Sequence, residues 1–121
     1  MSPPVPRFDA VLHPPARLQA CAVMATADEV EFATLRDALE VSDSVLSKHL
    51  RALDDAGYVQ LRKATSDGRV RTWAAFTAKG RRAFEAHVLE LQRLAGALSS
   101  STERSAPEVA PRALVPRRSP A

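Results

Sequence analysis

Residues 41–59, which read VSDSVLSKHLRALDDAGYV, decide the fold. Ser42 or Ser44 can cap the start of a helix, because a hydroxyl oxygen accepts a hydrogen bond from the unpaired N–H groups of the first turn. Gly57 stands where a left-handed residue usually ends a helix. Between them the large apolar residues recur at helical spacing and form one seam: Leu46, Leu50 and Leu53. This pattern predicts an amphipathic helix over residues 43–56 that buries the leucine seam.

The opposite face of this helix carries small hydroxyls and long cations and no large apolar residue. Its members are Ser44, Ser47, Lys48 and Arg51. Side chains of these types suit contacts with DNA phosphates and with base edges in the major groove. The solvated helix of a protein-interaction module would look similar but would more often include glutamate. The composition therefore favours a surface that binds nucleic acid.

Upstream, the sequence predicts a helix and a short strand. Pro14-Pro15 suits the first turn of a helix over residues 15–27, where a missing N–H costs nothing. The predicted buried stripe of this helix consists of Leu18, Cys21, Ala22 and Ala25. Residues 29–32 then alternate polar and apolar side chains, as a half-buried strand does.

A second, shorter helix is predicted over residues 33–40, with Thr34 as its N-cap and Asp37 completing a capping box. It is expected to bury Leu35, Ala38 and Leu39. A turn of two or three residues joins it to the 43–56 helix. This spacing is typical of a helix-turn-helix, in which the second helix enters the major groove.

Downstream, residues 58–63 and 69–76 are predicted strands, joined by a turn over residues 64–68. Alternation places these side chains inward: Val59, Leu61, Val70, Ala74 and Phe76. The hairpin is rich in cations, and its candidate DNA contacts are Lys63, Arg69 and Arg71. Such a ribbon can reach a minor groove or lie on phosphates, although Ser-Asp-Gly is also ordinary turn chemistry. Asp67, two residues before Arg69, is placed to accept a hydrogen bond from the Arg69 guanidinium and orient it. The sequence leaves the role of Trp73 open.

A last helix is predicted over residues 78–98, with Thr77 as its cap. Its apolar residues follow the 4-3-4-3 spacing of a coiled-coil seam: Phe84, Val88, Leu91, Ala95 and Leu98. We expect this seam to be the interface of a homodimer, because the second half of the helix extends past so small a core. The alternative is a helix that lies on its own domain, which Phe84 and Val88 alone could satisfy.

The charge of the chain is unevenly distributed. The 121 residues carry a net charge of +3, with a balance of −4 over residues 8–41 and +5 over residues 42–82. Segregation of this kind indicates a surface that faces a polyanion. We predict one domain over residues 8–98, a flexible Pro-rich arm over residues 1–7 and a disordered tail over residues 99–121. The expected class is mainly α with a small β-hairpin (α+β). The expected fold is a winged helix-turn-helix of order α-α-β-α-α-β-β-α, which includes one helix before the helix that begins at Pro14-Pro15.

The composition excludes several other classes. Cys21 is the single thiol, so the chain can form neither an internal disulfide nor a Cys-rich metal site. Because Cys21 lies on the apolar stripe of the predicted 15–27 helix, we expect a small buried side chain rather than a redox sensor. The spacing of His13, His49 and His87 does not predict a metal site. No catalytic triad, carboxylate pair or phosphate loop is present, so we expect neither an enzyme nor a cofactor. The sequence contains no secretory leader or membrane span, which predicts a cytoplasmic protein.

Residues 41–59 resemble the recognition-helix segment of ArsR/MarR-type winged-helix transcription regulators. Asp67-Gly68-Arg69 resembles the wing motif of the MarR group, residues 76–80 (FTAKG) resemble the segment after that wing, and residues 12–18 (LHPPARL) are similar to the opening of a compact winged-helix family. The resemblance covers about residues 8–95. It implies a dimeric bacterial regulator, a repressor by analogy, that binds a pseudo-palindromic operator in double-stranded DNA.

The resemblance also implies roles for particular residues. The helix contacts to DNA would be Ser44, Ser47, Lys48 and Arg51, and the wing contact would be Arg69. A small-molecule effector, not identified by the sequence, is compatible with this family. The chain lacks the long N-terminal dimerisation helix of larger MarR proteins, so their ligand pocket is not assumed. The alternatives are a winged-helix protein-interaction module that binds no nucleic acid and a nucleoid-type binder without sequence preference.

Overall fold

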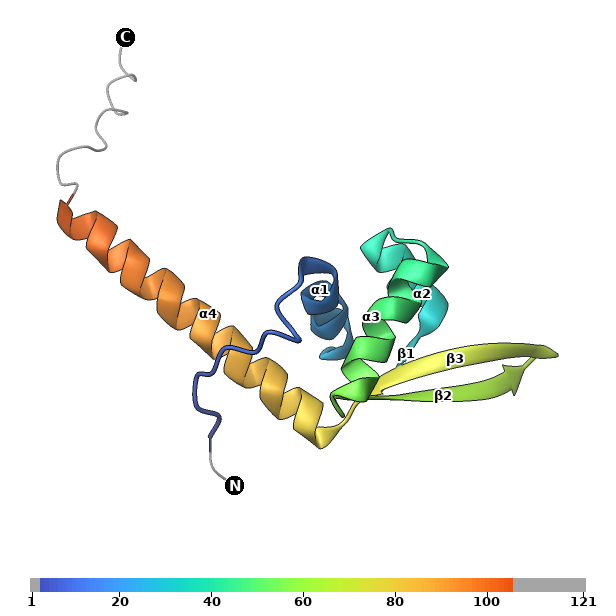
Figure 1. Cartoon of the computed structure of the whole chain (residues 1–121). Coiled ribbons are helices and arrows are strands. Elements are labelled where there is room, and N and C mark those ends of the chain that lie inside the picture. The colour runs from blue at the N-terminus through green and yellow to red at the C-terminus, as the bar shows by residue number, and fades with distance from the viewer. Residues whose placement is uncertain (1–2, 106–121) are drawn as a thin grey trace, which may run out of the picture. The chain divides into compact units, whose positions relative to one another are not determined.

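A computed structural model describes residues 3–105, which form four helices and three strands (Figure 1). In chain order these are α1 (Pro15–Met24), β1 (Val30–Glu31), α2 (Phe32–Leu39), α3 (Asp43–Asp55), β2 (Val59–Ser66), β3 (Arg69–Phe76) and α4 (Ala78–Ser105). The described residues up to Glu90 belong to one compact unit and those from Leu91 to a second, in which α4 continues. No helix within residues 3–105 is long and apolar enough to cross a bilayer. The α+β class and the winged-helix arrangement are confirmed.

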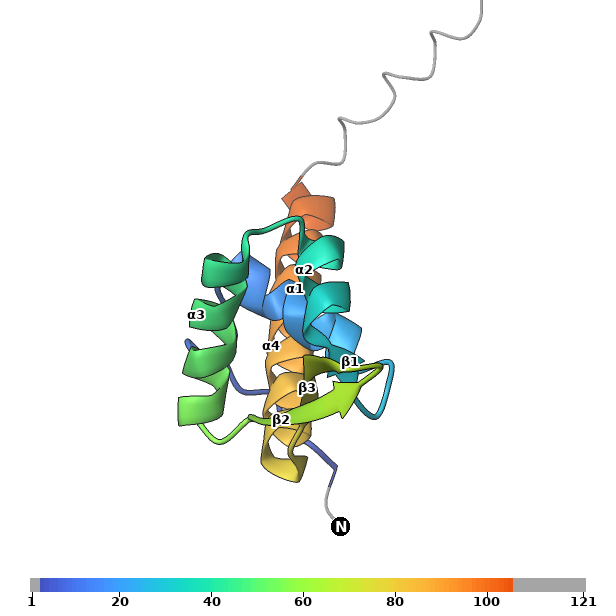
Figure 2. The same ribbon diagram turned by 90° about the vertical axis from the view of Figure 1, so that its right-hand side faces the viewer.

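The helix-turn-helix forms as predicted, with α2 and α3 side by side (Figure 2). Ser42 is the N-cap of α3, and its hydroxyl oxygen accepts a hydrogen bond from the Val45 amide at 3.2 Å. Gly57, with a φ of +80°, ends the helix in the left-handed region, and the Tyr58 amide donates back to the Leu53 carbonyl at 2.9 Å. Both ends of α3 are therefore set by the residues that the sequence marks.

The sheet has the order β1-β3-β2, and all its pairs are antiparallel. Asp67 and Gly68 both have positive φ, 54° and 75°, and the strands pair up to Ser66 and Arg69. The hairpin thus closes through a two-residue turn of type I′, tighter than the predicted turn over residues 64–68. Strand β2 consequently runs on to Ser66.

Only the base of the hairpin contributes to the core. Val59 and Ala74 are buried as predicted, but Leu61 is 40% and Val70 70% exposed, so the prediction that they point into a core is wrong. The alternation is present, but Leu61 borders an open groove beside α3, and Val70 lies near the tip of a hairpin whose distal half extends beyond the described helices (Figure 1). The distal half is therefore a projecting wing.

The core lies among α1, α2, α3 and the base of the sheet. Its buried apolar members are Leu12, Ala20, Cys21, Met24, Val30, Leu35, Leu46, Leu50, Leu53, Val59 and Ala74. The leucine seam of α3 is confirmed. The stripe predicted for α1 is partly wrong: Ala22 is exposed, whereas Ala20 and Met24 are buried. In α2, Leu35 is buried and Ala38 is exposed.

Several predicted boundaries change. Helix α2 follows β1 without a break and has Glu31 at its N-cap, so Thr34 lies inside the helix and does not cap it. Residues 8–14 form an extended segment and a turn, not the additional first helix, because the Asp9 side chain and carbonyl accept from the amides of Val11 and Leu12. Helix α4 continues to Ser105 instead of ending near Leu98. The predicted tail beyond residue 105 lies outside the described residues.

A buried histidine holds the segment before α1 against α4. His87 is fully buried, and its Nδ1 accepts a hydrogen bond from the Asp9 amide at 3.0 Å. The neutral ring must then carry its proton on Nε2, which lies 3.4 Å from Nδ1 of His13. Phe8 packs against both imidazoles, with ring centroids 4.8 and 5.0 Å away, and the Tyr58 hydroxyl donates to Asp9.

This arrangement predicts a loss of stability in acid. Burial and the neighbouring His13 lower the pKa of His87 below 6.5, against the opposing charges of Asp9 and Glu90. The unfolded chain binds this proton more readily than the folded chain. The contribution of His87 to the free energy of unfolding is therefore complete above pH 6.5 and is lost as the pH drops below it. Urea unfolding at about pH 8 and about pH 5 measures the fall. His87→Gln keeps a donor and an acceptor and should show a smaller fall, and an equal fall in both proteins would contradict the prediction.

Candidate nucleic-acid interface

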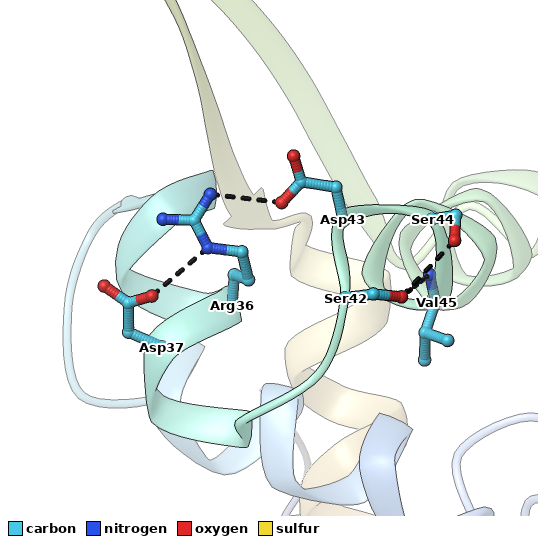
Figure 3. Close-up of polar contacts among 6 residues, drawn as sticks. All are labelled: Arg36, Asp37, Ser42, Asp43, Ser44 and Val45. Atoms are coloured by element: carbon cyan, nitrogen blue, oxygen red, sulfur yellow. Dashed lines mark hydrogen bonds and ion pairs between the residues drawn. The ribbon is translucent and has the colours of Figure 1, made fainter.

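The outer face of α3 is open to solvent. Ser44, Ser47, Lys48 and Arg51 are all exposed, while the leucines on the other side of the helix are buried. The Ser44 hydroxyl lies 3.3 Å from that of Ser42, at the N-terminal end of the helix (Figure 3). The four side chains singled out from the helical wheel therefore lie together on one accessible surface. No other part of residues 3–105 covers them.

A groove of about 670 Å³ runs between α3 and the wing. Ser47 and Arg51 line it from α3, and Lys63 lines it from β2. Because these residues share one groove, the helix and the proximal wing present cations to the same space. Three acids also line this groove: Asp43, Asp54 and Asp55.

The wing carries its cations on two faces. The pairing of Lys63 with Thr72 places Lys63 on the face that borders the α3 groove. Alternation puts the other wing cations on the opposite face: Arg62, Arg69 and Arg71. Trp73 lies on that opposite face, and the Arg62 guanidinium stands 5.8 Å from its ring centroid. Trp73 thus packs against the Arg62 guanidinium.

Two of these arginines are bound by acids from the β1 region. Arg62 donates to Glu29 from Nε at 3.2 Å and also from Nη2, and this contact lowers the pKa of Glu29 and raises the pKa of Arg62. Arg71 donates to Glu31 at 2.7 Å, in a half-buried ion pair. The Nε of Arg71 is buried without a partner. We call these two pairs the wing clamp, because they connect the wing to β1.

The wing clamp was missed by the sequence reasoning. Its signal was the alternation of Glu29, Val30 and Glu31, which puts both acids on one face of a strand. The pairing of Glu31 with Trp73 then brings that acidic face beside the arginines of the wing. Because the sequence does not specify that β1 joins the hairpin through β3, this contact could not be derived from the alternation alone.

A second ion pair connects the two helices of the helix-turn-helix (Figure 3). Arg36 of α2 donates to Asp43 at the start of α3 at 3.1 Å and to Asp37 at 3.2 Å. These carboxylates raise the pKa of Arg36, Asp43 contributing most. Arg36 therefore neutralises an acid that would otherwise face the groove uncompensated.

Four cations of α3 and the wing have no counter-charge. Within residues 3–99, no carboxylate lies within ion-pair distance of the side chains of Lys48, Arg51, Lys63 or Arg69. The expected pairing of Asp67 with Arg69 does not form, and Asp67 instead occupies the left-handed turn. These four residues belong to α3 and to the wing.

Other candidate chemistry is not supported in the part of the chain that the structure describes. That part contains no group of three or more histidine, cysteine or acidic side chains placed to hold a metal ion. Burial raises the pKa of Cys21 to about 12, so its thiol stays protonated at neutral pH, as the interpretation of a buried apolar residue requires. His49 is half-buried and accepts a hydrogen bond from Arg17 at 3.2 Å.

Comparison with known proteins agrees with this geometry. Residues 16–95 match the family described as winged helix DNA-binding domain. An uncharacterized protein of Methanocaldococcus jannaschii is 33% identical over 78 residues, which cover 64% of this chain and 85% of the relative. A transcriptional regulator homologue from Pyrococcus horikoshii has the same fold, with a TM-score of 0.69, 24% identity and coverage of 73% of this chain and 87% of that one. A MarR-family regulator from Enterococcus faecalis has a TM-score of 0.64, 17% identity and coverage of 78% and 84%.

Proposed function

The chain belongs to the winged helix DNA-binding domain family, and on that premise we propose that it is a repressor that binds a specific sequence in double-stranded DNA as a homodimer. Helix α3 enters the major groove, and the wing lies on the adjacent backbone or minor groove. The contacts to base edges come from Ser44, Ser47 and Arg51. The contacts to phosphates come from Lys48, Arg51, Lys63, Arg69 and Arg71.

One observation supports this proposal: cations of α3 and of the wing that form no ion pair with a described side chain border a single groove. Arg51 and Lys63 line it from the two elements, and Lys48 stands on the same exposed helix face. A stable fold does not require this arrangement, since like charges repel one another. A polyanion that lies across both elements would neutralise them. Salt-dependent association with DNA is the expected consequence.

Fluorescence anisotropy with a short random-sequence duplex tests the proposal. Because each phosphate contact releases counterions, the logarithm of the binding constant should fall linearly with the logarithm of salt, with a slope of about −0.9 per contact. Selection of bound duplexes from a random library then tests sequence preference. Absence of binding at low salt would favour the protein-interaction module, and binding without enrichment would favour the nucleoid-type binder. Either outcome rejects the proposed repressor.

Arg69 and Arg71 provide a matched pair of charge removals on one face of β3. Arg69→Ala should make the salt slope on a random duplex shallower by about 0.9, because this guanidinium has no ion-pair partner among the described side chains. Arg71→Ala should change the slope by clearly less, since Arg71 is already bound by Glu31. The measurement is anisotropy over a series of salt concentrations. Equal changes in the two variants would contradict a difference caused by the wing clamp.

The seam of α4 is the proposed dimer interface. Phe84 and Val88 are half-buried, while Leu98 is 70% exposed in a single chain. A second copy would cover the exposed part and present two recognition helices about 34 Å apart. Light scattering should give a species of twice 13.1 kDa. Leu98→Glu should shift this species toward the monomer. Leu94→Glu changes an exposed leucine outside the seam and should leave the dimer intact. A monomer at micromolar concentration in the unchanged protein would reject the interface.

A further inference from the structure

A second cleft, of about 570 Å³, lies between the segment before α1 and the first turns of α4. Its charged and aromatic lining includes Arg7 of that segment and Lys79 and Arg82 of α4. Tyr58, the residue immediately before β2, also lines it. The other lining residues are Phe8, Asp9, Ala10, Ala83 and Ala86. None of these residues takes part in the groove between α3 and the wing. The cleft is therefore a separate feature of the surface.

The wall of this cleft is held in place by hydrogen bonds. The Arg7 amide donates to the Ala86 carbonyl at 3.0 Å, and the Asp9 amide donates to the buried His87 at 3.0 Å. Asp9 in turn accepts from the Val11 amide at 2.9 Å and from the Tyr58 hydroxyl. Because these contacts fix residues 7–11 against α4 and Tyr58, Arg7 is kept at the cleft instead of moving with a free arm. A preformed site of this kind loses little entropy when a ligand binds.

The charges around this cleft are unbalanced. Arg7, Lys79 and Arg82 bring three positive charges, and none of them has a carboxylate of residues 3–99 within ion-pair distance. The Lys79 ammonium stands 5.7 Å from the centre of the Tyr58 ring. Asp9 is the single acid of the lining, and both its oxygens already accept hydrogen bonds. The cleft thus keeps a positive excess of two charges.

We propose that this cleft binds a small dianionic oxyanion, such as a phosphate monoester or a dicarboxylate. A dianion matches the excess charge, and guanidinium groups bind oxyanions through paired N–H donors. The volume falls within the range of about 300–1,000 Å³ that small-molecule sites occupy. The alanines and the Tyr58 ring leave room for a short apolar body beside the anionic group. The ligand would bind next to Gly57, where α3 ends, so its site adjoins the recognition helix without overlapping the proposed DNA contacts.

Titration with inorganic phosphate and with succinate, at constant ionic strength in chloride, tests the site on the full chain. Backbone amide NMR should show saturable shifts at Arg7, Lys79 and Arg82. The double variant Lys79→Ala/Arg82→Ala should bind at least about tenfold more weakly, because charge-assisted hydrogen bonds are lost. The matched control, Lys48→Ala/Arg51→Ala, removes the same charge from α3 and should bind within about twofold of the unchanged protein. The two anions distinguish a phosphate site from a carboxylate site.

Three results would overturn the proposal. The first is a shift pattern spread equally over the cations of α3 and the wing, which would mean general charge screening. The second is equal weakening in the two double variants. The third is a loss of random-duplex affinity in Lys79→Ala/Arg82→Ala as large as that in the control, which would make the cleft a DNA backbone contact. Arg7→Ala, on the other wall, provides a second variant if the double variant unfolds. The anion titration contains no DNA, so its outcome is independent of the proposed repressor function.

Discussion

Arg51→Ala is expected to abolish most of the sequence preference of the protein. Arg51 is exposed on α3 and lines the groove that faces the wing, and its fork of donors can hold two acceptors of one base. A bidentate contact of this kind distinguishes the correct base by about 1–3 kcal/mol. The variant should therefore lose roughly 5- to 150-fold in affinity for a selected duplex and much less for a random one.

Lys63→Ala is the matched comparison, because Lys63 lines the same groove from β2 but carries a single ammonium. We expect it to weaken binding to selected and random duplexes alike and to make the salt slope shallower by about 0.9. Both variants should be measured on the duplex that the unchanged protein enriches from a random library. If both variants affected the two duplexes equally, the assignment of base contacts to α3 and of phosphate contacts to the wing would be wrong.

Gly80→Ala is expected to cause the largest loss of stability. A Cβ atom on Gly80 would lie 1.9 Å from the carbonyl oxygen of Tyr58 and 2.7 Å from its carbonyl carbon. These are backbone atoms at the start of the wing, and the Tyr58 carbonyl also accepts from the Thr77 amide at 3.0 Å, so neither side can move freely. The free energy of unfolding should fall by about 3 kcal/mol, the upper end of the range for overpacked sites.

Gly96→Ala provides the control on the same helix. Apart from its chain neighbours and the backbone of the adjoining turns of α4, no described atom lies within 4 Å of a Cβ at Gly96, so alanine should improve helix propensity and add up to about 1 kcal/mol. Urea unfolding followed by circular dichroism measures both variants. A Gly80→Ala protein as stable as the unchanged chain would show that α4 and the wing are not packed as closely as described.

The helix-turn-helix could be predicted because its signals are local. Ser42, the leucine seam and Gly57 each act on residues within a few positions of themselves, so the start, the buried face and the end of α3 follow from spacing alone. The exposed face of α3 then consists of the positions that lie opposite the leucine seam. Its proposed DNA contacts could therefore be predicted from the sequence as a group, but the position of the wing beside them could not.

The errors arose where a side chain depends on distant elements. Leu61 and Val70 alternate correctly, yet both are exposed, because Leu61 borders the open groove beside α3 and Val70 lies near the tip of the wing, beyond the described helices. Thr34 resembles an N-cap, but the pairing of Glu31 with Trp73 carries the strand directly into α2. The partners of Arg62 and Arg71 are Glu29, just before the two-residue strand β1, and Glu31 within it, which precede them by 33 and 40 positions. Contacts of such separation are decided by topology, which spacing does not reveal.

Cys21 has a practical consequence. It is the single thiol of the chain, it is fully buried in the core, and its thiolate is suppressed by a pKa of about 12. A thiol reagent can therefore reach it only when the domain opens, so the rate of labelling at neutral pH reports how often that opening occurs. The unmodified protein thus contains its own probe of native-state fluctuations. The same labelling rate can be measured with DNA or a small anion present.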